Sequence, residues 1–124
     1  MTWRYTLEGE VPSKKNSRVL VFRGSRPRSI VSGSYRIWNT DALASLIAKR
    51  LPKTPLSGVE VHICMYFSTN RRKDLSNAAE GVMDTLVEAG ILSDDCWQVV
   101  PKLTIEAGGV DKKNPRSEIE IRVL

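Results

Sequence analysis

The chain has 124 residues, 41% of them hydrophobic, with two cysteines, one histidine and a formal net charge of +5. This length predicts one domain over residues 1–124 with a single core, and the apolar fraction argues against a disordered chain. No apolar run approaches the roughly 20 residues of a membrane span, and the first residues lack a signal-peptide pattern, so we expect a cytoplasmic protein without a membrane partner.

Charge is distributed unevenly along the chain. Residues 1–53 hold eleven Lys/Arg and three Asp/Glu, a net of +8, whereas residues 54–124 have a net of −3. The basic half indicates a nucleic-acid partner, although a soluble surface with a basic bias would give the same count. Cys64 and Cys96 lie far apart without metal-site spacing, which predicts free thiols in a reducing compartment. His62 is the only histidine, which excludes metal sites built from several histidines.

Four segments alternate between apolar and polar residues with the period of two that is typical of strands with one buried face. They are residues 3–8, 59–67, 97–107 and 118–123. Pro101 cannot donate to a strand ladder, so the third strand is predicted to lie at a sheet edge or to be bulged there. The last two strands are predicted to form a hairpin around the turn residues at 108–115.

Two segments carry apolar residues at helical spacing. The first covers residues 34–50, and the second covers residues 75–89, with Gly90 where a helix commonly stops. The predicted apolar stripes are Ile37, Trp38, Leu43, Leu46 and Ile47 in the first helix, and Leu75, Ala79, Val82, Met83 and Leu86 in the second. The fold class is therefore predicted to be α+β, a mixed sheet of four strands with two main helices. Residues 10–33 show no clear period and are predicted to be a long, basic, irregular loop.

Two tryptophans lie on apolar faces of these predicted elements. Trp38 belongs to the first helix, and Trp97 begins the third strand. Both are predicted to be core residues and not platforms for base stacking.

Acidic residues are concentrated between residues 74 and 95, directly after a basic triplet at 71–73. On the second helix, steps of three and four residues place Asn77, Glu80, Asp84 and Glu88 on one face, opposite the apolar stripe. Each acidic residue also has an ordinary explanation. The stripe can be a solvated helix face, Asp74 can cap the helix, and Asp94-Asp95 can form a turn.

Together the acidic residues indicate a metal site. If the second helix packs back on the sheet, its N-terminal end and the start of the third strand become neighbours, and Asp74 could converge with Asp94 or Asp95 on one cation. Mg²⁺ prefers such oxygen ligands, and it would polarise a phosphate oxygen and activate a water. Arg71, Arg72 and Lys73 could hold the flanking phosphates.

The same residues resemble the RusA family of Holliday junction resolvases. That family has an arginine-rich lead into Asp-x-Asp-Asn, a helix with an Asp-Ala-Leu-like segment, a Gly, and Asp-Asp before a strand. The matching segments are Arg71-Arg72-Lys73-Asp74-Leu75-Ser76-Asn77, Met83-Asp84-Thr85-Leu86 and Ala89-Gly90-Ile91-Leu92-Ser93-Asp94-Asp95. Early in the chain, Val11-Pro12-Ser13-Lys14-Lys15-Asn16 is similar to the family's Pro-Ser-x-Asn stretch. The resemblance spans most of the chain and preserves the order of the motifs.

The resemblance implies an Mg²⁺-dependent, structure-specific endodeoxyribonuclease of recombination and repair, in a family whose usual setting is a prophage. Such an enzyme acts as a homodimer and resolves four-way junction DNA by paired symmetric nicks, leaving 5′-phosphate and 3′-hydroxyl ends. The expected metal and catalytic residues are Asp74, Glu80, Asp94 and Asp95. The expected contacts to the DNA backbone are Lys14, Lys15, Arg18, Arg71, Arg72 and Lys73.

Two departures from the family pattern affect this expectation. Ser76 replaces the second aspartate of the motif, and Glu80 replaces a motif lysine. We hypothesise that Glu80 restores the negative charge that the metal needs. The alternatives are a non-catalytic branched-DNA-binding protein with a degenerate metal site, a metal nuclease acting on RNA or flaps, and a small basic structural protein whose carboxylates only cap and solvate helices.

Overall fold

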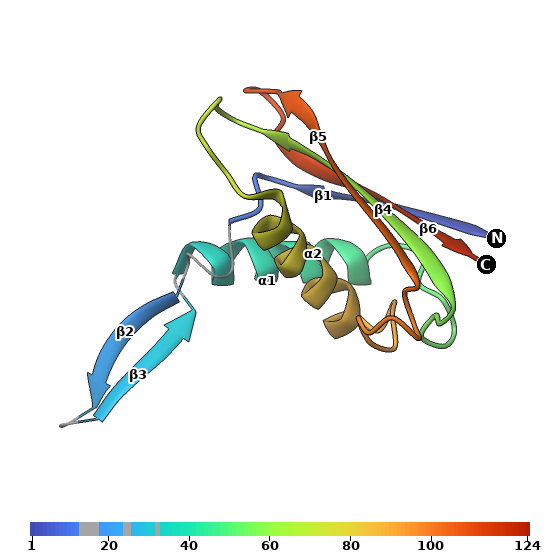
Figure 1. The fold of residues 1–124 in the computed structure, drawn as a ribbon, viewed down its shortest axis with the longest axis horizontal. Helices are drawn as coiled ribbons and strands as arrows, with labels where there is room; N and C mark the ends of the chain where they lie inside the picture. The colour runs from blue at the N-terminus through green and yellow to red at the C-terminus, as the bar shows by residue number, and fades with distance from the viewer. Residues whose placement is uncertain (13–17, 24–25, 32) are drawn as a thin grey trace.

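The structure is a computed structural model that describes the backbone of residues 1–12, 18–23, 26–31 and 33–124, and the side chains of residues 1–12 and 33–124. In Figure 1 the helices lie against the main sheet, and a separate ribbon of strands extends beside them. In chain order the elements are β1 (Thr2–Glu8), β2 (Arg18–Arg23), β3 (Arg26–Val31), α1 (Gly33–Ile47), β4 (Val59–Phe67), α2 (Leu75–Glu88), β5 (Lys102–Val110) and β6 (Arg116–Val123).

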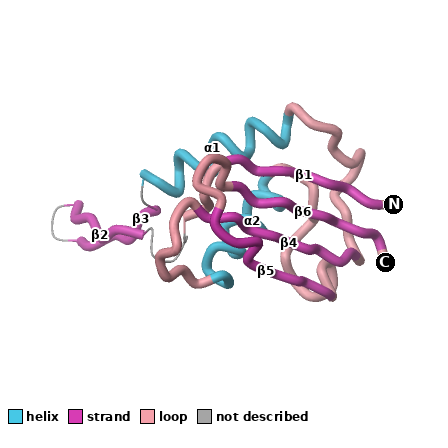
Figure 2. Tube along the Cα trace, turned by 90° about the horizontal axis from the view of Figure 1, so that it is seen from above, coloured by secondary structure: helices cyan, strands magenta, loops and turns pink. Residues whose placement is uncertain are grey.

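The main sheet has the strand order β1-β6-β4-β5 (Figure 2). β6 pairs antiparallel with both β1 and β4, whereas β5 pairs parallel with β4. The predicted α+β class with a mixed four-stranded sheet is therefore confirmed, as is the edge position of β5. The predicted hairpin between the last two strands is wrong, because β4 lies between β5 and β6.

The core lies between the helices and one face of the sheet. Alternate strand residues point into it, and Leu7, Ile63 and Ile121 are fully buried there. α2 contributes the predicted stripe, of which Val82 and Leu86 have no exposed surface. Burying such side chains contributes roughly 1.5–3 kcal/mol each, so this layer holds the two ends of α2 in fixed positions relative to the sheet.

α1 departs from its predicted stripe. Trp38 is a core residue as predicted, but Ile37 and Ile47 are about two-thirds exposed. Tyr35 and Ala42 take their places on the buried side. Tyr35 packs close to α2, where the position of a Cβ on Gly81 would lie 2.9 Å from the Tyr35 ring. The absence of a side chain at residue 81 therefore allows the close contact between α1 and α2.

The prediction that Trp97 is a core residue is wrong, since 73% of its surface is exposed. Its period-two pattern extends beyond the strand, which begins only at Lys102. In the preceding turn, the backbone amides of Val99 and Val100 both donate to the carbonyl of Cys96. A turn of this kind does not keep alternate residues on one face.

The segment predicted to be irregular contains regular structure. β2 and β3 pair antiparallel from Arg18↔Val31 to Arg23↔Arg26. Figure 1 shows this ribbon (blue to cyan) extending away from the sheet and helices. Residues 18–23 and 26–31 lack the apolar–polar alternation of a strand with one buried face, so the period-two criterion does not detect them.

Candidate functional site

Asp74 occupies the N-cap position of α2 in an extended backbone conformation. Its carboxylate makes no capping hydrogen bond to the helix backbone. Instead, Asn77 Nδ2 donates to Asp74 Oδ2 at 3.3 Å. Asp74, Ser76 and Glu80 are all exposed. The capping explanation therefore does not account for the Asp74 carboxylate, which faces solvent at the positive end of the α2 dipole.

Asp94 and Asp95 lie in the turn that follows α2. The Asp95 amide donates to Asp94 Oδ1 at 2.8 Å, which fixes the Asp94 side chain against the backbone of the next residue. A shallow cavity beside them is also lined by Asp84, Val87 and Glu88. Partial burial, the adjacent Asp94 and the charge of Asp84 raise the pKa of Asp95. This end of α2 is a group of mutually repelling carboxylates, which a cation would relieve.

α2 separates the two carboxylate groups that the sequence predicts to converge. The helix has 14 residues, which is about 20 Å at a rise of about 1.5 Å each. Asp74 lies at its start and the Asp94-Asp95 turn beside its last turns. Convergence of Asp74 with Asp94 or Asp95 within one chain is therefore wrong, because the crossover from β4 through α2 to β5 holds them at opposite ends.

Glu80 does not bring Asp74 and the Asp94-Asp95 turn into one site. It lies six residues after Asp74, which is about 9 Å along the helix axis. Among the residues whose side chains are described, no three His, Cys, Asp or Glu side chains are arranged to hold a metal ion. The described carboxylates thus form two separate groups at opposite ends of α2 rather than one convergent group.

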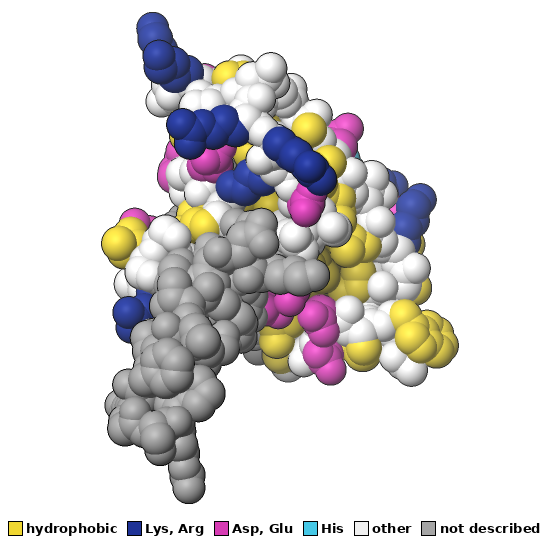
Figure 3. All heavy atoms as spheres, turned by 60° about the vertical axis from the view of Figure 1, so that its left-hand side comes forward, with side chains coloured by type: hydrophobic (Ala, Val, Ile, Leu, Met, Phe, Trp, Pro, Cys, Tyr) yellow, Lys and Arg dark blue, Asp and Glu magenta, His cyan; other side chains and the backbone are white. Residues whose placement is uncertain are grey.

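The predicted DNA contacts fall into three groups. Arg71 and Arg72 are exposed on the loop before α2. Lys14 and Lys15 lie outside the described residues, and Arg18 is in β2 with a side chain that is also outside them. On the face drawn in Figure 3, the described Lys and Arg side chains (dark blue) are interspersed with Asp and Glu (magenta).

Lys73 is oriented differently from its two arginine neighbours. Its Nζ donates to the carbonyl of Val11 and lies 3.9 Å from Glu10 Oε2. Glu10 Oε1 in turn accepts from the amide of Ser68 at 3.0 Å. Burial lowers the pKa of Lys73, and Glu10 opposes that shift. These contacts tie the loop before Asp74 to the end of β1, a role that the basic triplet in the sequence does not reveal.

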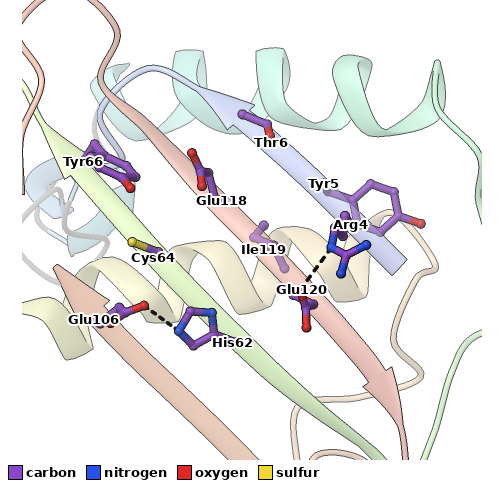
Figure 4. Close-up of a pocket in the computed structure, with 10 residues that line it drawn as sticks. All are labelled: Arg4, Tyr5, Thr6, His62, Cys64, Tyr66, Glu106, Glu118, Ile119 and Glu120. Carbon is purple, nitrogen blue, oxygen red and sulfur yellow. Dashed lines mark hydrogen bonds and ion pairs between the residues drawn. The ribbon is translucent and has the colours of Figure 1, made fainter. Parts of the chain in front are cut away.

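The face of the sheet opposite the helices is polar and open. His62 Nε2 on β4 lies 2.7 Å from Glu106 Oε1 on β5, and Arg4 Nε lies 3.1 Å from Glu120 Oε2 (Figure 4). Sequence reasoning assigned no role to these residues, although the charges at alternate strand positions are the pattern that would have indicated such a face.

Comparison with known proteins gives one clear match. In the described part of the chain no helix is both long enough and apolar enough to cross a bilayer. No curated protein matches the sequence. Residues 8–122 match the family described as Endodeoxyribonuclease RusA, which covers nearly the whole chain and both carboxylate groups. The chain therefore belongs to the RusA family of endodeoxyribonucleases, and this membership implies nuclease activity of the Holliday junction resolvase type.

Proposed function

We propose that this protein is an Mg²⁺-dependent homodimeric resolvase that cuts four-way DNA junctions by paired symmetric nicks. The observation that carries the proposal is the division of its carboxylates into two groups at opposite ends of α2. In a nuclease family member, neither group alone supplies the oxygen ligands that a divalent metal needs.

Two copies of the chain can supply what one copy lacks. In a two-fold dimer, Asp74 of one subunit can meet the partner's Asp95, and the symmetry then creates a second, identical site. Two sites are also what paired nicking of a four-way junction requires. Metal binding would then require the dimer, since each metal would lie between subunits.

The side chains of both groups fit such an ion. Asp74 and Glu80 are exposed carboxylates without a backbone cap to hold them, and Ser76 adds a hydroxyl where the family has an aspartate. Asp94 and Asp95 contribute two adjacent carboxylates, and partial burial together with the neighbouring Asp94 raises the pKa of Asp95. When bound, Mg²⁺ supplies neutralisation of the charge on the scissile phosphate and promotes attack by water.

The remaining residues position the DNA and the ligands. Arg71 and Arg72 are exposed beside Asp74, so they would hold phosphates flanking the cut. Lys73 fixes the loop that carries them. Ser76 and Glu80 make this site a variant of the family pattern, and a protein that binds junctions without cutting them is the competing function.

Mixing two inactive variants tests the site between subunits. Asp74→Asn and Asp95→Asn are each expected to abolish Mg²⁺-dependent cleavage of a synthetic four-way junction. When they are co-refolded, each mixed dimer regains one site with both aspartates intact, so about a quarter of the wild-type sites return as single nicks. If each chain used its own aspartates, the mixture would remain inactive.

Three controls separate the outcomes. EDTA should stop wild-type cleavage, a linear duplex should not be cut, and the nicks should be sealed by a ligase without prior treatment. Junction binding without cleavage by the wild-type protein would refute the proposal and favour the non-catalytic function. Glu80→Gln shows whether Glu80 is a ligand, because a ligand variant needs more Mg²⁺ for half-maximal cleavage.

A further inference from the structure

β5 is an edge strand with an open side. It hydrogen-bonds to β4 alone, and no other described strand lies beyond it in the sheet (Figure 2). Most of its nine residues are exposed, including Leu103 at 42%. Proteins usually shield such an edge, because its unpaired amides and carbonyls are a template for another strand.

The sequence of β5 is complementary to itself when two copies pair antiparallel about Thr104. Lys102 then lies directly opposite the partner's Glu106, and the two-fold axis repeats that ion pair. On the other face, Leu103 lies opposite the partner's Ile105. Lys102, Thr104 and Glu106 all belong to the open polar face of the sheet, where Figure 4 shows Glu106 next to His62.

Neighbouring registers lose this match. Centring the pair on Glu106 would place two carboxylates opposite each other, which is destabilising. Centring it on Leu103 or Ile105 leaves Lys102 opposite a residue without charge. Both charged side chains reach solvent beside their ion-pair partners within the chain. Lys102 is 67% exposed at 3.5 Å from Glu60, and Glu106 is 54% exposed at 2.7 Å from His62.

We propose that β5 is the homodimer interface, pairing with β5 of a second copy about Thr104 to form one continuous eight-stranded sheet. This inference rests on the proposed homodimer and adds where its subunits meet. The antiparallel arrangement also orients the carboxylate groups. The start of β5 follows the Asp94-Asp95 turn, and the end of β5 lies beside the end of β4, where the chain turns toward Asp74. The partner's turn is thereby brought to the Asp74 end of α2.

Cross-linking tests the register directly. Opposing Cβ atoms in an antiparallel pair lie about 4.5–5.5 Å apart, close to disulfide range. Thr104→Cys is expected to give a disulfide-linked dimer under mild oxidation, with the bond located by peptide mass mapping so that Cys64 and Cys96 are distinguished. Thr2→Cys is the control, because Thr2 is exposed on the opposite edge strand, β1, and should give no such dimer.

A charge swap tests the same register without a new bond. Lys102→Glu and Glu106→Lys should each weaken dimerisation about tenfold or more, measured by sedimentation, because each places like charges opposite each other twice. The double variant should restore the wild-type dissociation constant. Glu60 and His62 are unchanged in all three proteins, so recovery cannot come from contacts within one chain.

The tests of the β5 interface can fail independently of the mixing test for the site between subunits. If Thr104→Cys fails to cross-link and the double variant fails to recover, β5 is not the interface, even if mixing the two aspartate variants restores nicking. If the cross-link forms and the swap recovers while mixing restores nothing, the interface is correct and the site between subunits is wrong. A wild-type protein that stays monomeric at all concentrations would overturn the interface outright.

Discussion

Lys73→Met distinguishes a lysine that holds the fold from one that holds DNA. In the structure, Lys73 Nζ donates to the carbonyl of Val11 and lies 3.9 Å from Glu10 Oε2. It also lies 5.5 Å from the centre of the Phe67 ring, and only 20% of its side chain is exposed. Methionine keeps much of the apolar stem and removes the charge and the donor.

The expected loss of stability is about 1–2 kcal/mol. A hydrogen bond from a charged donor is worth about 1.5–3 kcal/mol, and a partly exposed ion pair adds less than about 1 kcal/mol. Removing a buried ammonium offsets part of that loss by relieving its desolvation. For a chain of this length, the change corresponds to a melting temperature lower by about 3–8 °C.

Junction binding by the same variant should keep its salt dependence. We expect the slope of log binding constant against log salt to match the wild type, because the Lys73 ammonium is engaged within the protein. Arg72→Met is the matched control, since it removes an exposed charge one residue away. It should reduce the slope by about 0.9 and change stability by less than about 0.5 kcal/mol. A reduced slope with unchanged melting for Lys73→Met would refute this assignment.

Two further substitutions test packing and electrostatics. Gly81→Ala should destabilise the protein by about 1 kcal/mol in chemical denaturation, because overpacking against Tyr35 exceeds the helix propensity gained. In a Tyr35→Leu background it should instead stabilise, and the absence of that reversal would exclude the ring contact as the cause. The hydrogen bond from Arg116 lowers the pKa of Asp111 below the ordinary value of about 3.9, so the pair stabilises the fold above that pH and loses its effect as pH falls through the lower folded-state pKa. Asp111→Asn should therefore lower the melting temperature at pH 7, with a difference from wild type that shrinks below about pH 4. A difference that persists unchanged at pH 2 would contradict the ion pair.

Periodicity predicted most of the elements because it reports which face of an element is buried. The four strands of the main sheet and both helices were found in this way, and α2 begins at Leu75 as predicted. The strand order could not be obtained from this signal. Ile119 and Ile121 alternate in the same way whether β6 pairs with β5 or lies between β1 and β4. Pairing partners are decided by packing between distant segments, which a local pattern does not contain.

The site residues illustrate the same distinction. The motif around Asp74 and Asp95 predicted the family, and the match over residues 8–122 confirms it. The motif did not predict that α2 would hold these aspartates apart, because spacing in a sequence does not say how far apart two residues lie after folding. The prediction for Lys73 was limited in a similar way. Its basic neighbours suggested one shared role, whereas its partners Glu10 and Val11 lie more than 60 positions earlier.

The central position of β6 has a consequence for how the protein is made. This strand pairs with β1 on one side and β4 on the other, although it is the last strand in the sequence. A nascent chain that has emerged only as far as residue 115 would present two long unpaired strand edges and an incomplete core. The sheet can form only after residues 116–123 leave the ribosome, so we expect late folding, dependence on chaperones at high expression, and rapid proteolysis of prematurely terminated chains.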